Sequence, residues 1–193
     1  MKIKDKKYIN AHMVLQILLF LVLIAVDRLT KILAVKYLKG QPSITIIKNI
    51  LELQYLENTG AAFGIFQNKQ WLFYIITVAV LAVLFYMWFI LNRRLKKYCR
   101  FCEVCPQDFK LKTYRHINYL NYLLAVLSAG AIGNFVDRIV NKYVVDFICF
   151  KIINFPIFNF ADICVTVTAV LLMIFFIFMY KDDKNFTIFS FKK

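Results

Sequence analysis

Four long apolar runs divide the chain, and each is bounded by polar or charged sequence. They cover residues 13–35, 71–91, 117–136 and 157–180. Each run has the length of about 20 residues that a helix needs to cross a hydrocarbon core, whereas core helices of water-soluble proteins are shorter. The pattern therefore predicts four transmembrane helices in a single membrane domain, residues 1–193.

A different period fills the segment that follows the first run. Within residues 43–47 and 50–56, apolar residues alternate with polar ones, which is typical of a strand with one buried face. Turn residues at Asn58-Thr59-Gly60 then end the pattern. We expect an all-α membrane protein with four transmembrane helices, a small extracytoplasmic β-sheet and interfacial loops.

Charge gives the runs a direction. The chain is 61% hydrophobic, which is too apolar for a soluble domain, yet its net charge is +14. Sixteen of the 25 Lys and Arg residues lie before residue 8, between 93 and 115, or after residue 180. These segments share one side if all four runs cross the bilayer. The positive-inside rule then places both termini and the loop 92–116 in the cytoplasm, and the loops 36–70 and 137–156 outside.

The same distribution restricts the class of partner. Because the basic residues flank the spans, the excess charge indicates topology and contact with anionic membrane lipids, and it does not indicate nucleic acid. Nothing in the pattern implies an oligomer. The first run lacks an A-x-A-like cleavage site and exceeds the usual signal-peptide core, so we interpret it as a retained span.

This topology brings the unusual polar residues to one depth, near the outer boundary, while the inner halves of the runs look almost purely apolar. An intramembrane ionisable cluster is a functional-site hypothesis by default. Several members also have structural interpretations, such as an i,i+4 ion pair, interfacial charges or hydrogen bonds between helices. The members with such interpretations are Asp27 and Lys31, Asp137 and Arg138, and Asn134 and Asn159.

Asp146 and Asp162 are harder to explain structurally. Each is a single carboxylate in apolar sequence, and the short segment after Asp146 can fold back over the start of the fourth run. Two close carboxylates cannot both ionise freely, so one keeps a proton. The ionised one can accept a proton from water and the other can donate one, which is acid–base hydrolysis of an amide. The alternative is a small ion or proton transporter that uses the same carboxylates.

A cysteine-rich segment lies in the predicted cytoplasmic loop. Cys99, Cys102 and Cys105 form C-x2-C-x2-C, with His116 further along the chain. Three thiolates and an imidazole suit zinc, but the second paired half of a zinc signature is missing. Reduced cytosolic thiols are the better interpretation, and zinc is a weak alternative.

Five sequence blocks resemble the lipoprotein signal peptidases (signal peptidase II). They are Asp27-Arg-Leu-Thr-Lys31, Asn58-Thr-Gly-Ala-Ala-Phe63, Gly130-Ala-Ile-Gly-Asn134-Phe-Val-Asp137-Arg138, Val144-Val-Asp146-Phe147 and Phe158-Asn-Phe-Ala-Asp162. The blocks occur in the family's order and span the chain from the first run to the fourth. No block is specific alone, but five in order are.

The resemblance implies an aspartyl endopeptidase of the bacterial cytoplasmic membrane, with its active site near the outer face. Such enzymes act on lipidated prolipoproteins, remove the signal peptide before the diacylglyceryl-modified cysteine, and need no metal or organic cofactor. By the same resemblance, Asp146 and Asp162 are the catalytic pair. The residues that match substrate-binding or supporting positions are Asp27, Lys31, Asn58, Gly60, Asn134, Asp137, Arg138 and Asn159.

Three positions depart from the family pattern. Ala129 precedes Gly130 where the family often has a second glycine, and Gly64 stands where it often has serine. Lys142 stands four residues before Asp146, where the family usually has glycine. These changes concern loop geometry and leave the aspartate pair in place.

Overall fold

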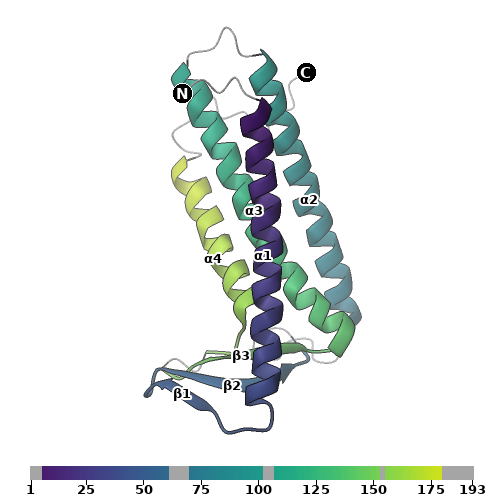
Figure 1. Ribbon diagram of the computed structural model, residues 1–193, viewed down its shortest axis with the longest axis vertical. Helices are drawn as coiled ribbons and strands as arrows, with labels where there is room; N and C mark the ends of the chain where they lie inside the picture. The colour runs from purple at the N-terminus through teal and green to yellow at the C-terminus, as the bar shows by residue number, and fades with distance from the viewer. Residues whose placement is uncertain (1–5, 61–69, 102–106, 153–154, 180–193) are drawn as a thin grey trace.

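Four helices stand side by side, and a small sheet lies at one end of them (Figure 1). The computed structural model describes residues 6–60, 70–101, 107–152 and 155–179. The helices are α1 (Lys6–Leu38), α2 (Gln70–Phe101), α3 (Gln107–Asn141) and α4 (Phe160–Ile174), and α4 continues into the π-helical turn η2 (Phe175–Met179). The predicted fold class is confirmed.

All four helices are long and apolar enough to cross a membrane. The segments that meet this criterion are Ile9–Leu38, Gln70–Lys96, Tyr114–Asn141 and Phe160–Phe178. Their outward surfaces carry large apolar side chains, such as Ile32 at 62% exposed and Phe85 at 67%. Such surfaces are stable against lipid and costly against water. The chain is therefore a multi-pass membrane protein.

The sheet has three antiparallel strands in the order β1-β2-β3. β1 (Ile44–Ile47) and β2 (Leu51–Asn58) confirm the two predicted strands, but β3 (Val144–Phe150) was missed, and the second outer loop was expected only to lie at the interface. Its sequence is nearly continuously apolar, because one face packs on a helix and the other lines a pocket, so no alternation marks it.

β3 is held between α1 and the start of α4. Val145 and Phe147 pack against Ala34 and Leu38 at the C-terminal end of α1. One edge of β3 pairs with β2, and the other edge makes an isolated bridge to Phe158, just before α4. Because side chains alternate along a strand, this packing turns the intervening Asp146 to the other face of the sheet.

Two glycines of α3 allow close helix packing at the end of the bundle that carries the sheet. A Cβ at Gly130 would lie 2.6 Å from the carbonyl oxygen of Ala161, on α4. A Cβ at Gly133 would lie 2.5 Å from a carboxylate oxygen of Asp27, on α1. Both distances are shorter than van der Waals contact, so a larger residue at either position would push the helices apart.

The expectation that the inner halves of the spans are almost purely apolar was wrong. Trp88 of α2 donates to Gln16 of α1 over 3.2 Å, and Asn121 of α3 donates to Asn92 of α2 over 3.3 Å. These bonds join helices, which is a common use of polar side chains in membranes. Residues 17–26 of α1, between Gln16 and Asp27, are all apolar and make up about 15 Å of helix. This helix therefore provides no polar path between Gln16 and the polar residues near the sheet.

Lys142 adopts the left-handed conformation that glycine would supply at the end of α3. Its φ is 68°, and its backbone N–H donates to the carbonyl of Arg138 over 3.2 Å, as a residue just beyond a helix C-terminus does. The substitution therefore keeps the turn and costs conformational strain.

We expect Lys142→Gly to raise the unfolding free energy by about 1 kcal/mol, because glycine takes a positive φ without steric cost. Thermal unfolding in detergent measures the change. Lys142→Ala retains the strain and serves as the control. If the two variants have equal unfolding free energies, relief of backbone strain is not the source of any gain from glycine.

Candidate active site

Asp146 and Asp162 line one pocket between the sheet and the helices. Its volume is about 500 Å³. Asp146 is 1% exposed and Asp162 is half-buried. The pocket wall also includes Asn58, Asn134, Arg138, Val144, Phe150, Phe155, Pro156, Ile157, Phe158, Ile163, Thr166 and Val167. Residues far apart in the chain thus meet around two carboxylates, as the topology predicted.

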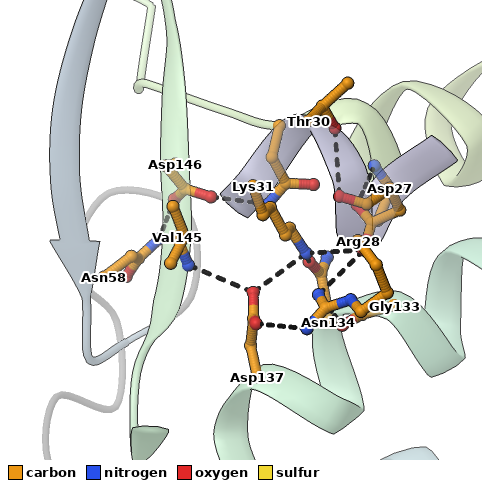
Figure 2. A network of polar contacts seen from close by, with 12 residues as sticks. Asp27, Arg28, Thr30, Lys31, Asn58, Gly133, Asn134, Asp137, Val145 and Asp146 are labelled. Atoms are coloured by element: carbon orange, nitrogen blue, oxygen red, sulfur yellow. Dashed lines mark hydrogen bonds and ion pairs between the residues drawn. The ribbon is translucent and has the colours of Figure 1, made fainter. Parts of the chain in front are cut away.

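Each oxygen of Asp146 accepts a hydrogen bond from a side-chain amide. The Nδ2 atom of Asn58 donates to one oxygen over 2.8 Å, and the Nδ2 atom of Asn159 donates to the other over 2.6 Å. Figure 2 shows Asn58, from β2, beside Asp146, on β3. Antiparallel pairing puts Leu56 opposite Asp146, so Asn58, two residues further on, lies on the same face of the sheet.

Asp162 belongs to the first turn of α4 and forms a capping box with Asn159. The Asp162 backbone N–H donates to Asn159 Oδ1, and the Asn159 backbone N–H donates to Asp162 Oδ2, both over 3.1 Å. The other oxygen of Asp162 accepts from Nδ2 of Asn134 over 2.7 Å. Local helix capping therefore orients this carboxylate, because the same pair of bonds also starts α4.

The three asparagines cannot turn their amides around without losing a bond. Each Oδ1 is already occupied: that of Asn58 by the backbone N–H of Gly60, and that of Asn159 by the backbone N–H of Asp162. Asn134 Oδ1 accepts from Lys31 over 2.9 Å and from Asn159 over 3.1 Å. The three NH2 groups must therefore face the carboxylates.

A buried ion network contacts the asparagines through the hydrogen bond from Lys31 to Asn134. The Lys31 ammonium is 3.1 Å from Asp27 and 3.0 Å from Asp137, and all three side chains are nearly inaccessible. Arg28 spans the same two carboxylates, at 2.9 Å from Asp27 and 2.7 Å from Asp137 (Figure 2). Arg28 was absent from the predicted site residues. Its position beside Asp27 inside an apolar run was the signal that could have found it.

This network reaches the backbone next to both site aspartates. Asp137 accepts from the N–H of Val145, which precedes Asp146, over 3.2 Å. Asp27 accepts from the N–H of Ala161, which precedes Asp162, over 3.1 Å. Asp27 and Asp137 do not line the pocket. They instead position the backbone next to Asp162 and Asp146, which do.

Arg138 joins the pocket to the start of α2. Its guanidinium donates to the carbonyl of Gly60 over 3.0 Å and lies 4.5 Å from the ring centre of Phe73. The hydroxyl of Tyr74 donates to the Arg138 carbonyl over 2.8 Å. Arg138 therefore stays in the protein and contributes positive charge to the pocket wall, in place of the interfacial charge that was considered from the sequence.

Burial sets the acidity of the strand carboxylate. Asp146 lies outside the four spans, and desolvation raises its pKa to about 6, against the hydrogen bond from Asn58, which lowers it. The charge of Asp162 raises the Asp146 pKa as well. A carboxyl that is protonated below pH about 6, beside a second carboxyl, is suited to acid–base chemistry.

The weak zinc alternative falls mostly outside the described residues. The structure does not describe Cys102 and Cys105, or the side chain of Cys99, while His116 packs edge-on against Phe175 at 5.8 Å. Among the described side chains, no three His, Cys, Asp or Glu residues gather as a metal site would require.

Comparison with known proteins agrees with the resemblance seen in the sequence. The family described as signal peptidase (SPase) II matches residues 19–178. The lipoprotein signal peptidase of Clostridium tetani (strain Massachusetts / E88) is 36% identical over 178 residues, 90% of this chain and 100% of that protein. The lipoprotein signal peptidase of Clostridioides difficile (strain 630) is 37% identical over 164 residues, 85% of this chain and 95% of that protein.

Solved structures extend the agreement to three dimensions. A bacterial membrane enzyme determined by the in meso method at 2.3 Å resolution superposes with a TM-score of 0.68 at 30% identity, covering 88% of this chain and 92% of that one. A second, at 1.9 Å, has a TM-score of 0.61 at 31% identity and covers 82% and 90%. By family match, sequence identity and fold, the chain belongs to the signal peptidase II family.

Proposed function

We propose that this protein is an aspartyl endopeptidase that removes the signal peptide from prolipoproteins. The observation that carries the proposal is the pair Asp146 and Asp162 on one pocket, with every carboxylate oxygen bonded to an oriented donor. The family match and the two relatives named lipoprotein signal peptidases support the substrate class. The site of cleavage is the bond before the diacylglyceryl-modified cysteine.

The pocket suits a substrate that arrives from the bilayer. Its α4 wall includes Ile163 and Val167, which are 37% and 50% exposed on the lipid-facing surface of the helix. A signal peptide can therefore reach the carboxylates laterally, while its lipid chains stay among membrane lipids. Extracting those chains would cost about 0.8 kcal/mol for each CH2 group.

The reaction that fits the pair is direct attack of water on the scissile amide. One carboxylate removes a proton from water while the other donates a proton to the carbonyl oxygen. The anchored amides keep both carboxylates oriented throughout, and this preorganisation avoids rearrangement as charge moves. The proposed reaction uses neither a metal nor an organic cofactor.

The location follows from the same proposal. The protein is a multi-pass component of the bacterial cytoplasmic membrane, with both termini in the cytoplasm. The sheet and the pocket then lie at the outer face, because they are at the end of the bundle away from the start of α1 (Figure 1). The excess of Lys and Arg in the remaining segments favours this orientation.

A synthetic precursor with a diacylglyceryl cysteine tests the function. We expect the purified protein in lipid nanodiscs to cut it once, before that cysteine, as identified by mass spectrometry. The same peptide without the lipid should be cut at least about 100-fold more slowly, because the lipid positions the amide at the pocket. Equal cutting of both peptides, or cutting elsewhere, would contradict the assigned substrate class.

A further inference from the structure

We propose that Asp146 is the site carboxyl that takes up a proton and acts as the general acid, whereas Asp162 carries the negative charge and acts as the general base. This assignment rests on the proposed peptidase function. It follows from an asymmetry in the groups that surround the two carboxylates, and neither the family match nor the named relatives assign these roles.

Asp162 has the surroundings of a charged carboxylate. It lies at the N-terminus of α4, where the helix dipole favours negative charge, and it accepts a backbone N–H of the capping box. Its second oxygen accepts from Asn134, whose own oxygen is bonded to the Lys31 ammonium. A cation on the carbonyl side of an amide polarises the NH2 group, so this donor is strengthened toward a charged acceptor.

Asp146 has the surroundings of a neutral carboxyl. It lies in a strand, which has little net dipole, and it is 1% exposed. Its two hydrogen-bond donors are the neutral amides of Asn58 and Asn159. Burying a charge with only neutral partners is more costly than burying the acid, so the proton belongs here.

The charged groups near the pair preserve this asymmetry. Lys31 of α1 contacts Asp27 and Asp137 directly, and its hydrogen bond toward the pair goes to Asn134, which donates to Asp162. The charge of Lys31 also lowers the pKa of Asp146, but burial outweighs it. Arg138 of α3 is bonded to Gly60, and its guanidinium makes no ion pair with either carboxylate within the described residues. β2 supplies only the uncharged Asn58, and α4 supplies Asp162 itself.

The acidity of Asp146 agrees with this assignment. Its pKa is raised to about 6, first by burial and further by the charge of Asp162. The same charge that makes Asp162 a base therefore helps Asp146 to keep its proton. The two roles are linked: each carboxyl group favours the opposite protonation state in its neighbour.

The assignment gives a balanced reaction. Asp162 takes a proton from water as the water oxygen bonds to the carbonyl carbon, and Asp146 gives its proton to the carbonyl oxygen. The neutral tetrahedral intermediate then breaks its C–N bond as Asp162 returns the proton to the leaving nitrogen. A hydroxyl proton of the intermediate passes back to Asp146, so the products are an acid and an amine and the pair is reset.

Infrared spectroscopy across a pH titration tests the assignment without reference to activity. Wild-type protein at pH 5 should show a protonated-carboxyl C=O band that disappears as pH rises through about 6. Asp146→Asn should lack this band. Asp162→Asn should keep it, with its midpoint at lower pH, because the charge that raises the Asp146 pKa is gone.

A band that persists in Asp146→Asn, or that is lost from Asp162→Asn, would overturn the assignment, as would its absence from the wild type. A second measurement needs no Asp162 variant. Because the folded-state pKa of Asp146 lies above its unfolded value, the folded protein binds the extra proton, so wild-type stability should fall as pH rises from 4 to 6. Asp146→Asn should weaken this dependence, and an unchanged profile would also overturn the proposal.

Discussion

Asp146→Asn and Asp162→Asn should each lower kcat for cleavage of the lipidated precursor by about 10³-fold or more. Each substitution keeps the size of the side chain and removes one of the two proton-transfer groups, which contribute about 10²–10⁴-fold in general acid–base catalysis. Residual activity should be similar in the double variant, because the two carboxylates act as a unit. Single-turnover cleavage in nanodiscs measures these rates.

Glu57→Gln is the matched control for this pair of variants. Glu57 lies beside Asn58 in β2, but its carboxylate pairs with Lys39 at the surface, at 2.8 Å, away from the pocket. We expect near wild-type cleavage from this variant. If Asp146→Asn or Asp162→Asn retained comparable activity while folded, the aspartyl mechanism would be wrong.

Lys31→Met should lower the unfolding free energy by about 3–5 kcal/mol, which is the usual cost of removing one partner from a buried ion pair. The Lys31 side chain is 3% exposed and compensates Asp27 and Asp137, each 2% exposed. Without it, Arg28 alone must neutralise two buried carboxylates. Titration with sodium dodecyl sulfate, followed by circular dichroism, measures the loss.

Lys36→Met removes an equal charge from the exposed surface of the same helix and should change stability by less than about 0.5 kcal/mol. Double-variant analysis with Asp137→Asn should recover part of the Lys31→Met loss, because one uncompensated charge is then absent. Equal stability of the Lys31 and Lys36 variants would show that the buried network is not the source of stability described above.

The ion network explains why loss of stability and loss of activity should be coupled in this protein. Asp27 and Asp137 accept the backbone N–H groups of Ala161 and Val145, each one residue before a site aspartate. Movement of either carboxylate therefore moves the backbone that carries Asp162 or Asp146. A pocket on a small sheet at the end of a bundle stays precise because the network joins it to two long helices.

Much of the fold could be predicted because its signals are local. A run of about 20 apolar residues identifies a span within a single window. β1 and β2 were visible because apolar and polar residues alternate along their sequences, and neither strand is buried on both faces: all four residues of β1 are exposed, and β2 mixes exposed with buried positions. β3 was not visible, because burial on both faces removes the alternation.

By itself, the amino-acid sequence determined the four helices and the choice of Asp146 and Asp162 as the unusual pair, since an isolated carboxylate in apolar sequence is costly wherever the chain folds. Only the tertiary structure decided how that cost is met. The three oriented asparagines, the role of Arg28 and the unequal surroundings of the two carboxylates depend on contacts such as Asp27 to Ala161, 134 residues apart. A hydrogen bond has direction and a short range, so its partners are known only when distant segments have packed together.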